Sequence, residues 1–325
     1  MRHQTLLELA ERDGIVLPDS LVSEWPPTLR ATDEKGWFRF QRLYDVARSV
    51  LRTESDVRRL VLEAAEDDVR DGGRWLEIQV DPSGYAARFG GITAFTELVL
   101  DAVRDASGRT GLGMAVVIAA NRTRHPLDAR TLARLAAQYA GRGVVGFGLS
   151  NDERRGSTVD FAGAFAIAER AGLLLVPHGG ELLGPDSIRT CLDSLHAGRL
   201  GHGVRAAEDP ALLDRIVASG VALEVCPVSN VALGVYSDLS SVPLPTLLAA
   251  GATVALGADD PLLFGSQLAA QYATMRAAHE LTDADLAELA RMSLRASRAP
   301  QEVLAAAMAD IDTWLSEDAT RRLPG

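Results

Sequence analysis

The sequence predicts an α/β protein, a (β/α)8 TIM barrel whose first strand is missing from the N-terminus. Seven short apolar runs recur along the chain, each followed by a turn and a longer segment rich in Ala, Leu and Arg. Such runs, nearly continuous in Val, Ile and Leu, are typical of strands buried on both faces of a parallel sheet. They span residues 75–82, 113–121, 143–150, 173–180, 199–204, 222–230 and 253–261.

Helical patterns separate these runs, for example at residues 92–107, 128–139 and 210–219, and two more segments, 5–12 and 38–71, precede the first run. Alternation of strand and helix predicts βαβ units. Seven units are one short of the eight that close a barrel. The glycine-rich G-x-G-x-x-G turn that marks many doubly wound sheets is absent. No linker or change in composition divides the chain, so we expect residues 1–325 to form one domain.

Composition excludes several classes of protein. The chain has 325 residues, of which 47% are hydrophobic, so it is long enough to bury a core without disulfides. A formal charge of −11 disfavours nucleic acid and anionic membranes as partners. No signal peptide or membrane span is visible, and Cys191 and Cys226 cannot form a disulfide framework or a four-thiolate zinc site. We therefore expect a cytoplasmic protein; its oligomeric state is not indicated.

Unusual polar residues gather where the predicted strands end. In a (β/α)8 barrel the carboxyl ends of the strands form the active-site face. Four consecutive strands therefore direct polar groups to one place. These residues are His178 and Glu181 after the fourth run, His202 after the fifth, Ser229 and Asn230 after the sixth, and Asp259 and Asp260 after the seventh.

His178 and Asp259 are candidate metal ligands, because an imidazole nitrogen and a carboxylate oxygen both suit Zn²⁺. Each alone also fits a structural role, as a buried histidine or a turn residue. Glu181 could act as a general acid or base over the same spot, or could simply be an acidic residue near the helix that begins at Pro185.

Asp260 and His202 also allow both a functional and a structural interpretation. Adjacent strand residues face opposite ways, so Asp259 and Asp260 can both point inward only if the strand ends or bulges there, which Pro261 favours. The other interpretation is a turn with a helix cap. His202 lies between two glycines, which leave room for a ligand or allow close backbone packing.

Four motifs together resemble the adenosine deaminase family of metal-dependent amidohydrolases. They are HGGE at 178–181, RLGHG at 199–203, CPVSN at 226–230 and GADDP at 257–261. The usual family forms are HAGE, RIGHG, CPxSN and NTDDP. The similarity extends to TLLELAERDGI near the start and VGFGLSNDE at 145–153, and covers residues 5–294.

The resemblance implies a reaction and roles for several residues. The family hydrolyses a 6-aminopurine nucleoside to the 6-oxo product and ammonia. His178 and Asp259 would be ligands of a single Zn²⁺, Glu181 would protonate the purine ring, and His202 would orient the attacking water and help to deprotonate it. Asp260 would hold that water or the substrate.

Two features depart from the family pattern. The family's two further zinc ligands belong to an H-x-H on the first barrel strand, and the sequence contains no H-x-H. Since strand counting also finds one strand too few, we expect the segment with that strand to be missing; His3 leads into a helix and is a poor substitute. Asn151 replaces a glycine whose amide contacts the purine, so it is a candidate substrate-binding residue that narrows the pocket or adds a polar contact.

The substrate is therefore expected to be a small purine nucleoside, either adenosine or a modified form such as aminodeoxyfutalosine. Two alternatives stay open: a non-catalytic purine-binding homologue that has lost the H-x-H ligands, and an amidohydrolase of other C–N bonds such as a cyclic amide. Trp37, Phe38, Phe40 and Tyr44 either pack in a core or form a hydrophobic lid over the sugar.

Overall fold

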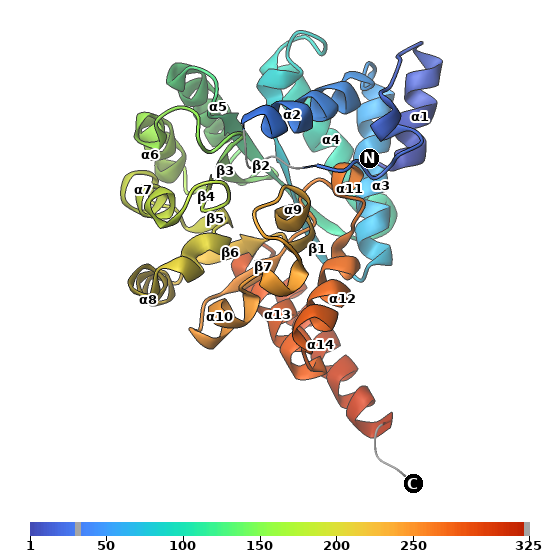
Figure 1. Cartoon of the computed structure of the whole chain (residues 1–325). Coiled ribbons are helices and arrows are strands. Elements are labelled where there is room, and N and C mark those ends of the chain that lie inside the picture. Colours follow the sequence, from blue (N-terminus) through green and yellow to red (C-terminus); the bar gives the residue numbers. More distant parts are fainter. Residues whose placement is uncertain (30–33, 322–325) are drawn as a thin grey trace.

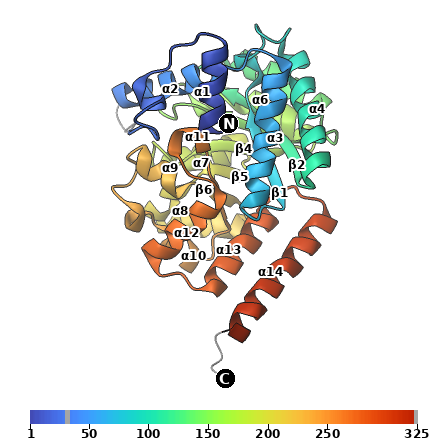
Figure 2. The same cartoon turned by 90° about the vertical axis from the view of Figure 1, so that its right-hand side faces the viewer.

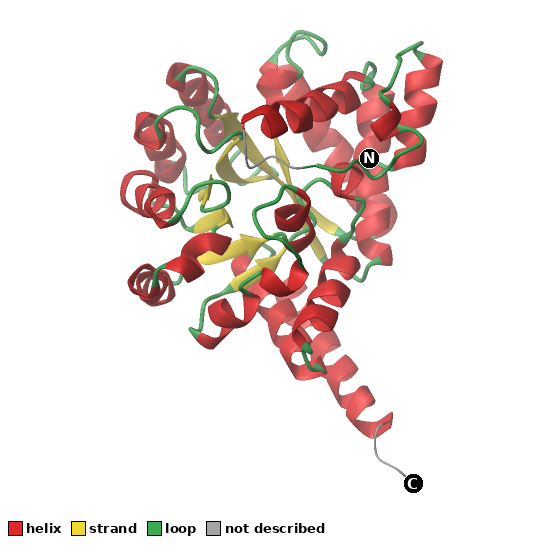
Figure 3. Ribbon diagram, viewed as in Figure 1, coloured by secondary structure: helices red, strands yellow, loops and turns green. Residues whose placement is uncertain are grey.

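Seven parallel strands alternate with helices around one curled sheet, as the secondary-structure colouring in Figure 3 shows. The computed structural model describes residues 1–29 and 34–321. Each strand pairs with the next along the chain, in the order β1 to β7. The strands are β1 (Trp75–Val80), β2 (Gly113–Asn121), β3 (Val144–Ser150), β4 (Leu174–Gly179), β5 (Arg199–His202), β6 (Ala222–Val225) and β7 (Val254–Leu256).

Helices surround the sheet and cover one end of it (Figure 1). Before the sheet come α1 (His3–Arg12), α2 (Glu34–Ser49) and α3 (Glu54–Arg70). The helices that follow are α4 (Ile92–Thr110), α5 (Pro126–Gln138), α6 (Ala162–Arg170), α7 (Pro185–Leu195), α8 (Pro210–Ser219), α9 (Pro227–Ala232), α10 (Leu244–Ala249), α11 (Pro261–Phe264), α12 (Leu268–His279), α13 (Asp283–Ala296) and α14 (Gln301–Arg321).

The α/β barrel prediction is confirmed, and a strand lies within each of the seven predicted runs. Within the described residues no pairing joins β7 back to β1, so the sheet is a curled half-barrel with one open side. A cavity follows this side, since its lining includes residues of both β1 and β7. The opening matters for function because the cavity continues to the carboxyl ends of the strands.

The predicted helix at 38–71 is wrong in one respect, because the structure divides it into α2 and α3. Thr53 ends the connection between them and caps α3: its hydroxyl accepts from the backbone N–H of Asp56, whose carboxylate accepts from the N–H of Thr53. This reciprocal pair is a capping box, which satisfies N–H groups that a helix start leaves free.

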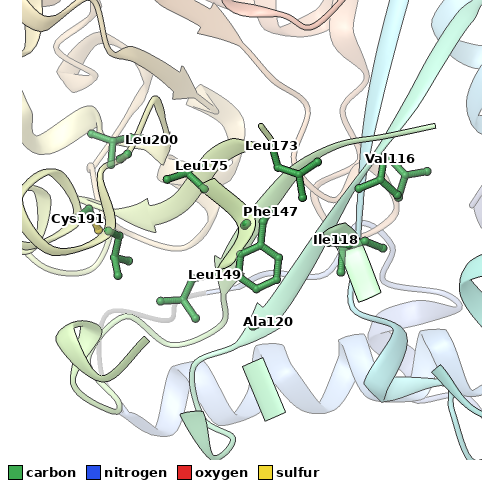
Figure 4. Packing of buried hydrophobic residues seen from close by; sticks show 14 of the residues in the cluster. Val116, Ile118, Ala120, Phe147, Leu149, Leu173, Leu175, Cys191 and Leu200 are labelled. Carbon is green, nitrogen blue, oxygen red and sulfur yellow. The ribbon is translucent and has the colours of Figure 1, made fainter. Parts of the chain in front are cut away.

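The main hydrophobic core lies between the sheet and its surrounding helices. Figure 4 shows Ile118 of β2, Phe147 and Leu149 of β3, and Leu175 of β4 packed in one layer. All four side chains are buried. This layer fixes the strands, and therefore the directions of the residues at their carboxyl ends.

A second hydrophobic cluster joins α1 and α2 to the short helix α11. Trp37 and Phe40 of α2 belong to it together with Phe264, whose ring stacks on that of Phe40 with centroids 6.0 Å apart. In Figure 2, α1 and α2 lie at the opposite end of the molecule from α14, which extends away from the barrel. Among the described residues, no helix is both long and apolar enough to cross a bilayer.

Candidate active site

All six predicted site residues line one cavity of about 610 Å³ at the carboxyl ends of the strands. They reach it from β3, β4, β5 and β7 or from the turns that follow, so residues far apart in sequence meet as the barrel prediction required. The six are Asn151, His178, Glu181, His202, Asp259 and Asp260.

His178 and His202 face each other at the ends of neighbouring strands. Their ring centroids are 5.0 Å apart in an edge-to-face arrangement. Gly201 permits this approach, because a Cβ at that position would lie 2.7 Å from His178 Nδ1. Burial lowers the pKa of His178 well below its usual value, and nearby His202 and Arg122 lower it further. His178 is therefore neutral at physiological pH, the form that can bind a metal.

Glu181 and His202 form a buried acid–base pair, with Glu181 Oε1 3.6 Å from His202 Nε2. Burial raises the pKa of Glu181 to about 7. Burial pushes the pKa of His202 down, but Glu181 and Asp259 outweigh it and raise the pKa above its usual value. A carboxyl group with a pKa of about 7, beside a buried imidazole, can exchange a proton with a bound molecule.

Asp259 and Asp260 follow β7, which ends at Leu256, so the predicted strand end is observed. The backbone of Asp259 has φ +56°, and its Oδ2 accepts a 2.6 Å hydrogen bond from Ser229 Oγ. Asp260 is the residue before α11; burial, then the adjacent Asp259, raises its pKa. Ser229 lies in α9 rather than at the end of β6, where the sequence analysis placed it.

The residues at this end of the cavity fit a borderline cation such as Zn²⁺. His202, Cys226 and Asp259 each offer a ligand atom, and these atoms lie within 4.8 Å of one another. His178 is not one of these three residues, but its ring lies against the ring of His202. The Nδ1 atoms of His178 and His202 are buried and have no hydrogen-bond partner among the described residues. Ser229 supports Asp259 as hydrogen-bonding neighbours of metal ligands commonly do.

Asn151 borders the cavity, and neighbouring groups engage its side-chain amide. Its Nδ2 donates to Gln41 Oε1 of α2 over 3.0 Å, and its Oδ1 accepts from the backbone N–H of Asp152. The backbone of Asn151 has φ +80°, a region that glycine adopts without strain. Trp37, Phe40 and Tyr44 line the cavity from α2, and the first two are buried in the second hydrophobic cluster, which confirms the packing interpretation for them. Phe38 is exposed, and a lid over the sugar stays a prediction.

Comparison with known proteins identifies the family. The family model described as Adenosine deaminase matches residues 1–314. The chain belongs to the adenosine deaminase family. It is therefore an enzyme of the deaminase class, which acts on a C–N bond of an adenine-like substrate, and the resemblance noted from four short motifs is confirmed.

Individual relatives agree with this family. A protein of Streptomyces virginiae, provisionally named adenosine/adenine deaminase, is 65% identical over 97% of this chain and 93% of its own length. An adenine deaminase of Rhizobium leguminosarum bv. trifolii is 35% identical over 83% of this chain and 84% of its own. The crystal structure of an adenine deaminase from Arthrobacter aurescens has a TM-score of 0.88 and 29% identity, covering 97% of this chain and 95% of that one.

Several residues near the cavity of this adenosine deaminase family member could not be predicted from the sequence. Glu153 ends the VGFGLSNDE motif, which gives no local sign that its carboxylate binds the loop that carries Glu181. Arg122 follows β2 and donates to the carbonyl of His178 over 2.6 Å. Gln41 had no signal, because its partner Asn151 is 110 positions away in sequence.

His3 is excluded from the cavity, as expected. Its ring stacks on Trp25 with centroids 4.4 Å apart, and its Nε2 lies 2.8 Å from the carbonyl oxygen of Leu21.

Proposed function

We propose that this chain catalyses the zinc-dependent hydrolytic deamination of a 6-aminopurine, either adenine or an adenosine-like nucleoside. The observation that carries the proposal is the buried Glu181–His202 pair, 3.6 Å apart, in the same cavity as Asp259. The reaction forms a C–O bond at C6 from water and breaks the C6–N bond, so that the products are the 6-oxopurine and ammonia. Relatives named adenine deaminase support this choice.

Glu181 acts in this proposal as the general acid. Its carboxyl group, with a pKa of about 7, holds a proton in a large share of molecules at neutral pH. Transfer of that proton to a ring nitrogen makes C6 more electrophilic. An ordinary exposed glutamate, with a pKa near 4.3, would be ionised and unable to donate.

His202 and Asp260 handle the attacking water. The imidazole of His202 orients the water and accepts its proton, and the carboxylate that Glu181 becomes after protonating the ring stabilises the resulting imidazolium. Asp260, half-buried at the same cavity, holds the water or the amino group. The backbone of Asn151 borders the purine, and its side chain is engaged with Gln41.

His178 and Asp259 would hold one Zn²⁺ per chain. The neutral imidazole of His178 and the carboxylate of Asp259, itself hydrogen-bonded to Ser229, are suitable donors. A zinc ion bound there would supply a water of lowered pKa, about 7 instead of 15.7, so that hydroxide would be available at neutral pH. Cys226 lies close enough to Asp259 to offer a further donor atom.

The size of the cavity supports the proposed substrate class. A volume of about 610 Å³ is within the usual range for small-molecule sites and accommodates a purine with or without a sugar. Adenine, adenosine and aminodeoxyfutalosine all carry the same 6-amino group. Both cysteines of the chain are free and buried, which supports a reducing compartment such as the cytoplasm.

The test combines elemental analysis with ammonia release from adenine, adenosine and aminodeoxyfutalosine. We expect zinc in the purified protein and ammonia from at least one compound. Glu181→Gln should keep the zinc and lose at least about 100-fold in kcat, whereas Asp259→Ala should lose the zinc. Purine binding without ammonia release would favour the non-catalytic homologue. A ring-opened acid from a cyclic amide would favour the third alternative.

A further inference from the structure

The carboxylate of Glu153 is buried beneath the loop that carries Glu181. The side chain comes from the turn after β3, and the residue is 3% exposed. Four consecutive backbone N–H groups, those of residues 180–183, donate to its two oxygens at 2.6, 3.0, 2.7 and 2.9 Å. The hydroxyl of Ser187, in the first turn of α7, donates as well.

This arrangement uses one carboxylate to fix a turn that has little regular structure. The turn between β4 and α7 has no ladder or helix bonds for these N–H groups, and buried N–H groups need partners. Bonds from N–H groups to an ionised carboxylate are stronger than those to a neutral oxygen. Glu153 therefore determines the path of the chain from Gly180 to Leu183.

Gly180 makes the path possible. It has φ +77°, and a Cβ there would lie 2.4 Å from a carbon of Ile188, so only glycine fits. The turn is thus closed on one side by α7 and held on the other by Glu153. The side chain of Glu181 leaves this turn toward the cavity and reaches His202.

Arg122 holds the beginning of the same segment. Its guanidinium, 2% exposed, donates to the carbonyl of His178 over 2.6 Å and to the hydroxyl of Thr158 over 3.2 Å. A longer contact of 3.5 Å reaches the carbonyl of Glu153. Arg122, which follows β2, therefore holds the carbonyl of His178. Glu153, which follows β3, holds the backbone of Glu181.

We propose that Glu153 is a positioning residue for the general acid: its buried carboxylate fixes the 180–183 turn so that Glu181 points at the reacting purine and at His202. Glu153 itself does not touch the substrate. This inference rests on the proposed function, because it assigns a partner to Glu181 in that reaction.

The decisive variant is Glu153→Gln, which keeps the size of the side chain but replaces one acceptor oxygen by an NH₂ group. That group would face N–H or O–H donors on either side. We expect kcat for the best 6-aminopurine to fall about 100-fold, as small misplacements of catalytic groups do, with KM changed less than about threefold. Zinc content should stay unchanged.

Hydrogen exchange provides a readout that needs neither zinc nor substrate. Amide hydrogens of residues 180–183 should exchange about tenfold faster in Glu153→Gln, because they lose their acceptor, while those of the β2 and β3 strands stay protected. Should the wild-type chain release no ammonia, the proposed function fails, and the exchange comparison still decides whether Glu153 holds this turn.

Asp56→Asn is the matched control. Asp56 is also a buried carboxylate, 2% exposed, that accepts from two backbone N–H groups, but it lies at the start of α3. Loss of stability without loss of kcat is expected there. If Glu153→Gln lowers Tm as Asp56→Asn does while kcat stays within about twofold and exchange at 180–183 is unchanged, Glu153 is only structural and the proposal is overturned.

Ser187→Ala covers the case in which Glu153→Gln does not fold. It removes one of the five donors and leaves the carboxylate in place. A fall in kcat of about three- to tenfold, with KM and zinc unchanged and faster exchange at 180–183, supports the positioning role. Unchanged kcat and unchanged exchange in this variant contradict it.

Discussion

The side-chain amide of Asn151 donates a 3.0 Å hydrogen bond to Gln41 Oε1, which joins the end of β3 to helix α2 beside the cavity. Asn151 has φ +80°, and such a conformation is costly for a residue with a side chain. The strained backbone of Asn151 thus occurs together with a hydrogen bond that holds α2 beside the cavity. We therefore expect Asn151 to affect substrate binding through the position of α2 as well as through its own backbone.

Loss of the hydrogen bond between Asn151 and Gln41 should weaken substrate binding more than it slows the chemical step. Gln41→Ala removes the acceptor, so α2 is held less firmly and we expect KM to rise about three- to tenfold with kcat nearly unchanged. Asn151→Gly removes the donor but relieves the backbone strain, so the same rise in KM should come with unchanged or higher Tm. Steady-state kinetics and thermal unfolding measure both.

Arg42→Ala is the control for the α2 contact, because Arg42 is exposed on the same helix. Its KM should match that of the wild type. An unchanged KM in both Gln41→Ala and Asn151→Gly would show that the bridge has no part in binding.

Ser229 should tune the metal site without taking part in the reaction. Its hydroxyl donates to Asp259 over 2.6 Å and so fixes the direction of that carboxylate. Ser229→Ala should weaken zinc binding about 10- to 100-fold, as losses of such supporting contacts do. Competition with a chelator measures the change. Equal zinc affinity in the variant would mean that Asp259 is oriented by other contacts or is not a ligand.

Asp56 should make the stability of the fold depend on pH. The Arg12 guanidinium, with the N–H groups of Arg52 and Thr53, holds the pKa of Asp56 below its usual range. Because the pKa is lower in the folded than in the unfolded chain, the stabilisation is complete above the unfolded value of about 4 and is lost as pH falls below it. Asp56→Asn should therefore cost about 2 kcal/mol at pH 7.

Unfolding in urea between pH 7 and pH 3 tests this dependence. The difference between wild type and Asp56→Asn should be constant in the neutral range and shrink toward the acid end. Thr53→Ala is a useful comparison, since it removes the hydroxyl of the same capping box at a cost of about 1 kcal/mol that should hardly vary with pH. A difference that grows as pH falls would contradict the assignment.

Much of the barrel could be predicted because its strands are continuous apolar runs. A run such as the one at 113–121 is typical of a strand that is buried on both faces of a parallel sheet. The ends of those runs also placed six site residues in one cavity. The break between α2 and α3 could have been predicted too, since Thr53 and Asp56 have the spacing of a capping box.

Other features of the site lie beyond the sequence alone. Glu153 and Leu183 are 30 positions apart, and Ser229 and Asp259 are equally distant, so neither contact has a local signal. Which way Asn151 points depends on the position of α2, which is set by packing of Trp37 and Phe40 in the second cluster. Such contacts arise only when tertiary packing brings separate strand ends together.

Glu77 of β1 should be among the most important residues for stability, because its carboxylate neutralises a buried arginine. Glu77 Oε2 lies 2.5 Å from Arg199 of β5, and the two side chains are 9% and 6% exposed. Arg199 also pairs with Glu224 of β6 at 2.6 Å, and the other oxygen of Glu77 accepts from the backbone N–H of Arg298. One ion network thus joins β1, β5 and β6 with the connection to α14.

Glu77→Ala removes one partner and leaves Arg199 with a buried charge that Glu224 offsets only in part. A broken buried ion pair usually costs about 3–5 kcal/mol, much more than an exposed one. Arg74→Ala is the matched control, because its pair with Asp310 is half exposed and should cost less than about 1 kcal/mol. Urea unfolding of both variants measures the contrast, and equal losses would show that the Glu77 network contributes no more than a surface contact.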